Sequence, residues 1–170
     1  VSGGEAGAKS GKLSIMVGGD KSAYLKIKFL LSILGSKITY LGKSGSGQVC
    51  KACNQILVAQ TIQSISEIIT IAKKSDINPM TIRQALLAGY ANSKILEVHG
   101  KRMIESDYKP GFKLSLHNKD LKIAKNLVKN IGLTLKGLNR VQKAMRDAEL
   151  EGLSEFDSSV IHTILEKTYK

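Results

Sequence analysis

The 170-residue sequence predicts a mainly α-helical protein, in which an all-helical part at 45–170 follows a strand–helix–strand segment at 1–44. The first 44 residues contain two short runs of β-favouring residues, and each run stops at a glycine. From Gly45 onward, apolar residues recur at helical spacing to the end. Since two strands are too few to form an independent sheet, we interpret 1–44 as the last part of an α/β domain.

Turn and capping residues delimit the elements of the N-terminal segment. The first strand stops at the Gly18-Gly19 pair, and Asp20 then provides a suitable N-cap for a helix. The expected elements are, in order, a glycine-rich stretch at 2–11, a strand at 13–17, a helix at about 21–34 and a strand at 37–41.

The helical part is divided in the same way. Asn78 followed by Pro79 is a strong helix start, and Gly132 and Gly152 mark places where helices end. The first helix is apolar on most of its circumference, so we expect it to be buried on several sides. The predicted helices are at about 47–74, 79–88, 93–105, 113–130, 135–151 and 156–169.

The formal net charge of +12 raises nucleic acid as a possible partner. However, the excess is mostly lysine spread over every helix, with few aromatic residues to stack on bases. We therefore expect a solvated lysine-rich surface and no nucleic-acid partner. We expect no membrane partner either, because no run of about 20 apolar residues is uninterrupted. The start Val1-Ser-Gly-Gly resembles the interior of a protein, so we expect the chain to be a piece of a longer one.

Cys50 and Cys53 form a Cys-x-x-Cys pattern, which is found in redox pairs and in half-sites for zinc. Neither use fits well, because the pair lies inside a predicted helix and no histidine pair has zinc-ligand spacing. We interpret the cysteines as two small, buried, free thiols in a cytoplasmic protein, and we predict no metal site. His117 and His162 are interpreted as packing or capping residues.

Lys51 is the first candidate for chemistry, because it lies among apolar residues near the start of the longest helix. An ammonium in such a place must find a partner or lose part of its affinity for the proton. Asn54 and Gln55 follow at i+3 and i+4, so the three side chains share one helix face. They could hold a carbonyl or hydroxyl oxygen and exchange a proton with it, or could simply form an interhelical polar stripe.

Three weaker patterns accompany this triad. The backbone N–H groups of Ser2-Gly3-Gly4 could hold a carboxylate or phosphate, although such a stretch is more often only a turn. Gly45-Ser-Gly47 before a helix is also a possible anion site, but it lacks the third glycine of a dinucleotide fingerprint. Lys119-Asp120, preceded by Phe112, supplies a cation and an acid, a pair that is most often superficial.

Together these segments resemble the β-hydroxyacid dehydrogenase family, the group that contains 3-hydroxyisobutyrate dehydrogenase and tartronate semialdehyde reductase. The resemblance covers essentially the whole chain, and three motifs occur in the order of the family. They are a substrate loop and strand in 1–19, a catalytic-lysine motif in 45–55 and a third signature in 112–121. Asn54-Gln55 and the residues around 2–5 and 109–120 look most like tartronate semialdehyde reductase, with 3-hydroxyisobutyrate dehydrogenase the nearest alternative.

The resemblance implies a role for each candidate residue. Lys51 would be the general acid/base for reduction of a semialdehyde acid to a hydroxy acid. The remaining assignments are Ser2, Gly3 and Gly4 for the substrate carboxylate, Asn54 or Gln55 for the reacting oxygen, and Lys119, Phe112 and Asp120 for the NAD or NADP cofactor. The resemblance does not distinguish NAD from NADP.

The resemblance also implies an all-helical domain like that of 6-phosphogluconate dehydrogenase, preceded by the end of a Rossmann domain, and a homodimer or higher homo-oligomer. The chain lacks the glycine-rich fingerprint that binds the cofactor pyrophosphate, so we expect these 170 residues to be inactive alone. A non-catalytic helical dimerisation or interaction module is the alternative of another class.

Overall fold

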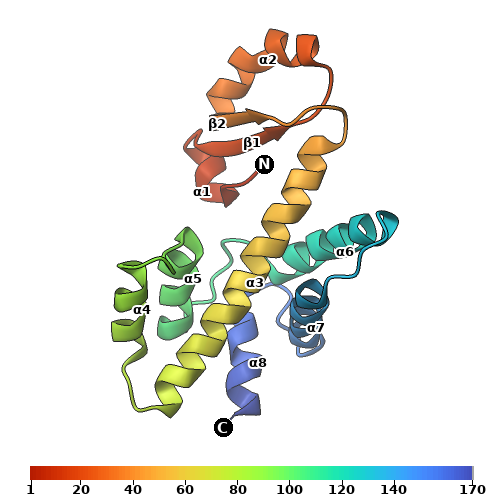
Figure 1. Ribbon diagram of the computed structural model, residues 1–170. Coiled ribbons are helices and arrows are strands. Elements are labelled where there is room, and N and C mark those ends of the chain that lie inside the picture. The colour runs from red at the N-terminus through yellow and green to blue at the C-terminus, as the bar shows by residue number, and fades with distance from the viewer. Residues whose placement is uncertain (170) are drawn as a thin grey trace. The chain divides into compact units, whose positions relative to one another are not determined.

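A computed structural model describes residues 1–169, and the predicted fold class is confirmed (Figure 1). The described chain is mainly helical, with two parallel strands near its start. It divides into two compact units, Val1–Gln55 and the residues from Ile56 onward. The long helix α3, Ser46–Lys74, begins in the first unit and continues in the second.

The first unit contains a two-stranded parallel sheet. Strand β1 (Leu13–Val17) pairs with β2 (Gly35–Tyr40), and helix α2 (Lys21–Leu34) connects them. Asp20 caps α2 as predicted, since its carboxylate accepts a hydrogen bond of 2.8 Å from the Ala23 N–H. The second strand begins at Gly35, earlier than predicted. A Cβ at this position would lie 2.4 Å from the Leu13 carbonyl oxygen, so glycine permits the close pairing there.

The glycine-rich stretch before β1 is partly helical, which the sequence pattern did not predict. Residues Gly4–Lys9 form the short helix α1. Gly3 precedes it with φ at 137°, a conformation that glycine adopts without strain, and its carbonyl accepts the N–H of Gly7 at 2.9 Å. Short backbone bonds of this kind can form a single turn of helix where the sequence has no apolar periodicity.

Helix α2 exposes an apolar face. Its residues include large hydrophobic side chains that are more than half exposed, such as Phe29 at 76% and Ile33 at 61%. Tyr24 on the same helix is buried, and its ring stacks on that of Tyr40 with centroids 5.1 Å apart. One face of α2 therefore covers the strands, while the other presents apolar surface to solvent in the described chain.

The second unit is built from helices joined by short connections. The predicted cap at Asn78 is confirmed, since its side chain accepts the N–H of Met80 at 2.8 Å. Ser93, the first residue of a predicted helix, is the N-cap of that helix and accepts the N–H of Leu96 at 3.0 Å. The helices after α3 are α4 (Pro79–Leu87), α5 (Lys94–Glu105), α6 (Leu114–Asn130), α7 (Lys136–Leu150) and α8 (Ile161–Thr168). The last predicted helix begins later than expected, because a 3-10 turn, η1 (Ser158–Val160), precedes α8.

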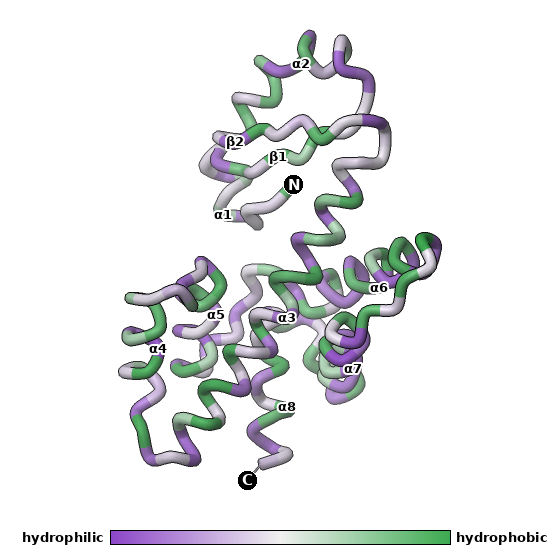
Figure 2. Tube along the Cα trace, viewed as in Figure 1, coloured by the Kyte–Doolittle hydropathy of each residue, from purple (hydrophilic) through white to green (hydrophobic). Residues whose placement is uncertain are grey.

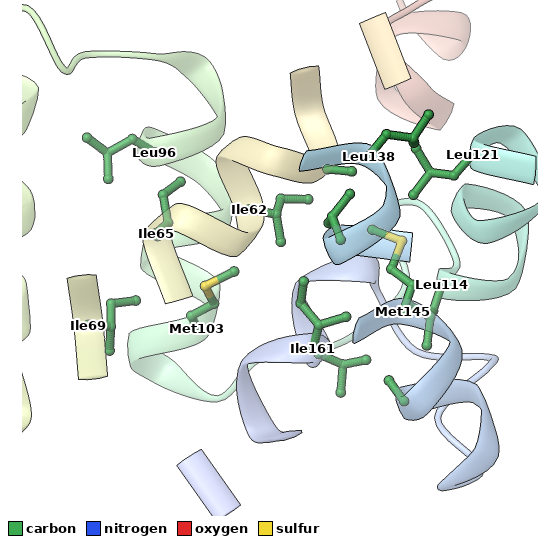
Figure 3. Packing of buried hydrophobic residues seen from close by; sticks show 14 of the residues in the cluster. Ile62, Ile65, Ile69, Leu96, Met103, Leu114, Leu121, Leu138, Met145 and Ile161 are labelled. Carbon is green, nitrogen blue, oxygen red and sulfur yellow. The ribbon is translucent and has the colours of Figure 1, made fainter. Parts of the chain in front are cut away.

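The core of the second unit forms around α3 (Figure 3). Ala59, Ile62, Ile65 and Ile69 recur at helical spacing and contact buried residues of the other helices. By length and average hydropathy alone, α3 is also long and apolar enough to cross a membrane, although polar residues interrupt its apolar runs. Hydrophobic residues recur along the helix in Figure 2. Packing in the core accounts for many of them.

The structure corrects the interpretation of the two cysteines. Both are free, but neither is buried: Cys50 is half-buried and Cys53 is exposed. The neighbouring residues Ala52 and Gln55 define the buried face of this part of α3, at 5% and 4% exposure. Cys53 is rotated away from that face by its position in the helical repeat.

Candidate functional site

The three polar residues on α3 form a connected group. Lys51 Nζ donates a hydrogen bond of 2.9 Å to Gln55 Oε1, and Asn54 Nδ2 donates one of 2.8 Å to the same oxygen. Gln55 is buried, whereas Lys51 and Asn54 are half-buried. The spacing thus places the three side chains together, and the ammonium has an acceptor within hydrogen-bond distance.

Strand β1 contacts both the start of this helix and the loop that contains Ser2. The backbone of Ser2 pairs with that of Ser14, through N–H to carbonyl distances of 2.9 and 2.8 Å. At the other end of the strand, a Cβ on Gly47 would lie 2.5 Å from the Met16 carbonyl oxygen. The N-terminus of α3 therefore lies directly against β1, and only glycine at position 47 allows this approach.

The predicted cradle of Ser2, Gly3 and Gly4 is only partly a loop. Ser2 belongs to the pairing with β1, Gly3 is the residue before α1, and Gly4 is its first residue with φ at 59°. Both glycines have positive φ, so their identity is explained by backbone conformation. Whether their N–H groups also bind a carboxylate stays a prediction.

In the second unit, the predicted cofactor residues lie at and near the start of α6. Phe112 is half-buried, and its ring centroid is 5.4 Å from that of the fully buried His117. Lys119 Nζ lies 3.3 Å from Asp120 Oδ1, with the lysine side chain 61% exposed and the aspartate 17%. The structure thus connects Phe112 to the first turns of α6 and presents Lys119 to solvent.

His117 and His162 are both fully buried, and their role as packing or capping residues stays a prediction. His162 Nδ1 lies 2.9 Å from Ser66 Oγ, and its Nε2 lies 3.3 Å from Glu166 Oε1. Burial lowers the pKa of His162, and the nearby Lys73 ammonium acts in the same direction, whereas the Glu166 carboxylate opposes both.

The first turn of α6 is capped by backbone carbonyls, and the side chain of Lys113 at the N-cap makes no capping hydrogen bond. The N–H groups of Leu114 and Ser115 donate to the carbonyls of Phe156 and Ser154 at 2.8 and 3.1 Å. The segment just before η1 therefore fixes where α6 begins.

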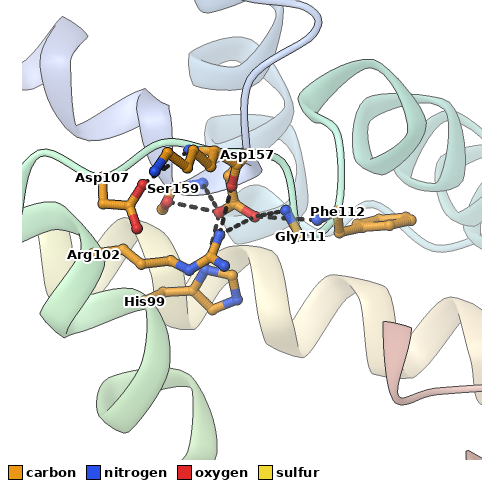
Figure 4. A network of polar contacts seen from close by, with 8 residues as sticks. His99, Arg102, Asp107, Gly111, Phe112, Asp157 and Ser159 are labelled. Carbon is orange, nitrogen blue, oxygen red and sulfur yellow. Dashed lines mark hydrogen bonds and ion pairs between the residues drawn. The ribbon is translucent and has the colours of Figure 1, made fainter. Parts of the chain in front are cut away.

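Asp157 is the residue that the sequence interpretation missed. It is fully buried, and its carboxylate accepts hydrogen bonds from the N–H groups of Gly111 and Phe112, both at 3.1 Å (Figure 4). His99 Nδ1 and Arg102 lie 3.1 and 3.0 Å from the same carboxylate. One buried charge thus joins α5, the loop before α6 and η1.

The environment of Asp157 determines its ionisation. Burial alone would raise the pKa of the carboxyl, but hydrogen bonds from His99 and Ser159 outweigh burial and lower the pKa well below its ordinary value of 3.8. The carboxylate therefore carries its negative charge at neutral pH.

Each predicted set of site residues lies within one unit. The substrate and proton-transfer candidates belong to Val1–Gln55, and the cofactor candidates belong to the part from Ile56 onward.

Comparison with protein families decides where the chain belongs. Residues 45–165 match the family model described as the NAD-binding domain of NADP-dependent 3-hydroxyisobutyrate dehydrogenase. Residues 1–42 match the NAD binding domain of 6-phosphogluconate dehydrogenase. The chain belongs to the β-hydroxyacid dehydrogenase family.

Individual members of the β-hydroxyacid dehydrogenase family align over nearly the whole chain. 2-Hydroxy-3-oxopropionate reductase of Escherichia coli is 45% identical over 98% of this chain and 57% of its own length. A probable mitochondrial 3-hydroxyisobutyrate dehydrogenase-like protein of Arabidopsis thaliana is 35% identical, over 98% of this chain and 50% of its own length. The chain therefore spans about half the length of these relatives.

A solved structure of a β-hydroxyacid dehydrogenase has the same fold. The 3-hydroxyisobutyrate dehydrogenase of Mycobacterium tuberculosis, solved with L-serine, superposes with a TM-score of 0.89 at 26% identity. The alignment covers 96% of this chain and 58% of that one.

Proposed function

We propose that this chain is the substrate-binding and proton-transfer part of an NAD(P)-dependent dehydrogenase that reduces a small semialdehyde acid to a hydroxy acid. The observation that carries the proposal is the hydrogen-bonded group of Lys51, Asn54 and Gln55 on α3. This group places an ammonium beside two carboxamides, and such a set of groups can bind a carbonyl oxygen and protonate it during its reduction.

In the proposed reaction, Lys51 donates its proton to the aldehyde oxygen. The reduced nicotinamide, when bound, supplies the hydride that reaches the carbonyl carbon, so the aldehyde becomes a primary alcohol. Lys51 then recovers a proton from water, and in the oxidative direction it removes the proton from the hydroxyl group. Asn54 or Gln55 orients the reacting oxygen, and the N–H groups of Ser2, Gly3 and Gly4 hold the substrate carboxylate.

The finer assignment of substrate is 2-hydroxy-3-oxopropionate, with glycerate as the product. It is supported by the 45% identity to the E. coli reductase of that name and by the Asn54-Gln55 pair. 3-Hydroxyisobutyrate or a related semialdehyde acid is the alternative, supported by the Arabidopsis relative.

The residues at the start of α6 suit one end of a dinucleotide. Phe112 provides a half-buried ring, Lys119 an exposed cation, and the fully buried Asn118 has a side-chain oxygen without a hydrogen-bond partner in the described chain. We assign Phe112, Lys119 and Asp120 to the cofactor, NAD or NADP. The pyrophosphate needs a glycine-rich turn, which we place in the rest of an α/β domain of the full-length protein.

The apolar face of α2 supports this placement. Phe29, Ile33 and Leu25 are more than half exposed, and such a face is usually covered in a complete domain. We further propose that the full-length protein is cytoplasmic and forms a homodimer or higher homo-oligomer, with Leu57 and Ile71 of α3 as apolar exposed residues available to an interface. Light scattering on the purified full-length protein measures the oligomeric state.

The test is the Lys51→Ala variant of the full-length protein. If Lys51 transfers the proton, turnover of NAD(P)H with 2-hydroxy-3-oxopropionate falls by about 10²-fold or more. The matched control is Lys74→Ala, which removes an exposed lysine at the far end of the same helix and should retain activity. Equal rates for Lys51→Ala and the parent enzyme would contradict the proposal and favour the non-catalytic helical module.

A further inference from the structure

Asp157 divides its contacts between its two oxygen atoms. Oδ1 accepts from the Ser159 N–H at 3.1 Å and the Ser159 hydroxyl at 2.7 Å, and it lies 3.1 Å from His99 Nδ1. Oδ2 accepts from the N–H groups of Gly111 and Phe112 and lies 3.0 Å from Arg102. One oxygen therefore organises η1, while the other organises the loop before α6 (Figure 4).

Oδ2 of Asp157 and its partner Arg102 contact the loop before α6 at several backbone atoms. Arg102, which pairs with Asp157, also donates a hydrogen bond of 2.8 Å to the Lys109 carbonyl. A Cβ on Gly111 would lie 3.2 Å from the Arg102 guanidinium and 3.3 Å from Asp157 Oδ2, so the backbone lies directly against the ion pair. The backbone between Lys109 and Phe112 is thus fixed by a buried, charge-assisted network.

Fixing this loop also fixes the residues that follow it. Phe112 contacts His117 through its ring, and Leu114 begins α6 with its N–H bonded to the Phe156 carbonyl, the residue before Asp157. Lys119 and Asp120 lie in the next turn of the same helix. A displacement at Phe112 therefore reaches the assigned cofactor residues without any change in their own side chains.

We propose that Asp157 is a positioning residue, which sets the affinity for the nicotinamide cofactor by fixing, through Oδ2, the Phe112 loop and the first turn of α6. The proposal rests on the proposed function, because it takes Phe112, Lys119 and Asp120 as cofactor residues. Asp157 itself acts only through the backbone of these elements.

The experiment compares Asp157→Asn and Arg102→Met with Ser159→Ala in the full-length enzyme. In Asp157→Asn an amide NH2 group replaces one carboxylate oxygen, so the N–H groups that face it lose their acceptor. In Arg102→Met only the Oδ2 atom of Asp157 loses a partner. Both variants should raise KM for NAD(P)H by about tenfold or more with a smaller change in kcat, because misplaced binding groups weaken the bound state. Ser159→Ala perturbs the Oδ1 side, so it should lower Tm but leave this KM unchanged.

Hydrogen exchange at the Gly111 and Phe112 amides gives a second readout, independent of turnover. Exchange should be faster in Asp157→Asn and Arg102→Met than in Ser159→Ala at equal distance from Tm. If Asp157→Asn does not fold, Arg102→Met carries the test by itself.

A lower Tm with unchanged KM for the cofactor in both Oδ2 variants would overturn the proposal, as would an equal rise of KM in Ser159→Ala. If the parent enzyme turns over no semialdehyde or hydroxy acid with NAD(P)H, the proposed function has failed instead. In that case the amide exchange still tests whether Oδ2 of Asp157 fixes the Phe112 loop. Unchanged exchange at Gly111 and Phe112 overturns this part of the proposal, and faster exchange supports it.

Discussion

Lys51 Nζ and Gln55 Oε1 are joined by a hydrogen bond of 2.9 Å along one turn of α3. Replacing Gln55 by Leu removes this acceptor, and hydrogen bonds to charged groups contribute about 1.5–3 kcal/mol, so we expect kcat of the full-length enzyme to fall by about 10–100-fold. Steady-state kinetics measures the change. Gln60→Leu, on another face of α3, is the control and should retain kcat. An unchanged kcat in Gln55→Leu would show that the hydrogen bond has no role in turnover.

The contact between Gly47 and Met16 predicts a steric requirement. In Gly47→Ala the new Cβ would lie 2.5 Å from a backbone carbonyl, which cannot move as a side chain can. We expect the free energy of unfolding to fall by about 1–3 kcal/mol, as is typical of overpacked sites. Urea titration of the full-length protein measures it. Gly89→Ala is the matched control, because a Cβ there meets nothing within 4 Å. Equal stability of the two variants would mean that β1 and α3 can separate without cost.

The lowered pKa of Asp157 predicts a loss of stability in acid. Because the folded-state pKa lies below the ordinary value of 3.8, the ionised carboxylate stabilises the fold fully above that pH. This contribution is lost as the pH falls below about 4, and the guanidinium of Arg102 then loses its ionised partner. Urea unfolding at pH 7, 5, 4 and 3 should therefore show a decline that is smaller in Asp157→Asn. Asp147→Asn, at a more exposed ion pair, should keep the parent's decline.

His162 predicts a second pH dependence at higher pH. Burial favours its neutral form, so the folded-state pKa is lowered from 6.5. The contribution of neutral His162 to the free energy of unfolding is therefore complete above pH 6.5 and is lost as the pH falls below it. The carboxylate of Glu166 and the ammonium of Lys73 face this histidine. His162→Asn, whose amide can still bond to Ser66, should have a flatter stability curve between about pH 7 and pH 5. Identical stability curves for the variant and the parent would show that His162 is not the origin of the pH dependence in this range.

Local signals predicted much of the fold. Asp20 and Asn78 mark helix starts because an N-cap bonds to an N–H only two or three residues away, and both of these bonds are present. The triad of Lys51, Asn54 and Gln55 was predicted for the same reason, since helical spacing alone brings the side chains together.

Features that depend on distant residues were not predicted. The partners of Asp157 at Gly111 and His99 are 46 and 58 positions away, so no local pattern shows that the carboxylate is buried and saturated with donors. The run Asp157-Ser158-Ser159 has the composition of a helix cap, and that signal could have placed the cap but not its long-range contacts. Cys53 was misplaced because a helix that is apolar on most of its circumference does not show which face is covered.

The backbone cap of α6 also constrains the order in which the protein can be completed during synthesis. The N–H groups of Leu114 and Ser115 must wait for the carbonyls of Ser154 and Phe156, which leave the ribosome much later. Until then these N–H groups lack their acceptors, so the first turn of α6 can fray. Cleavage of the backbone just after α7 would leave the segment that caps α6 attached by noncovalent contacts alone, even though every residue assigned to substrate, proton transfer and cofactor would remain in the protein.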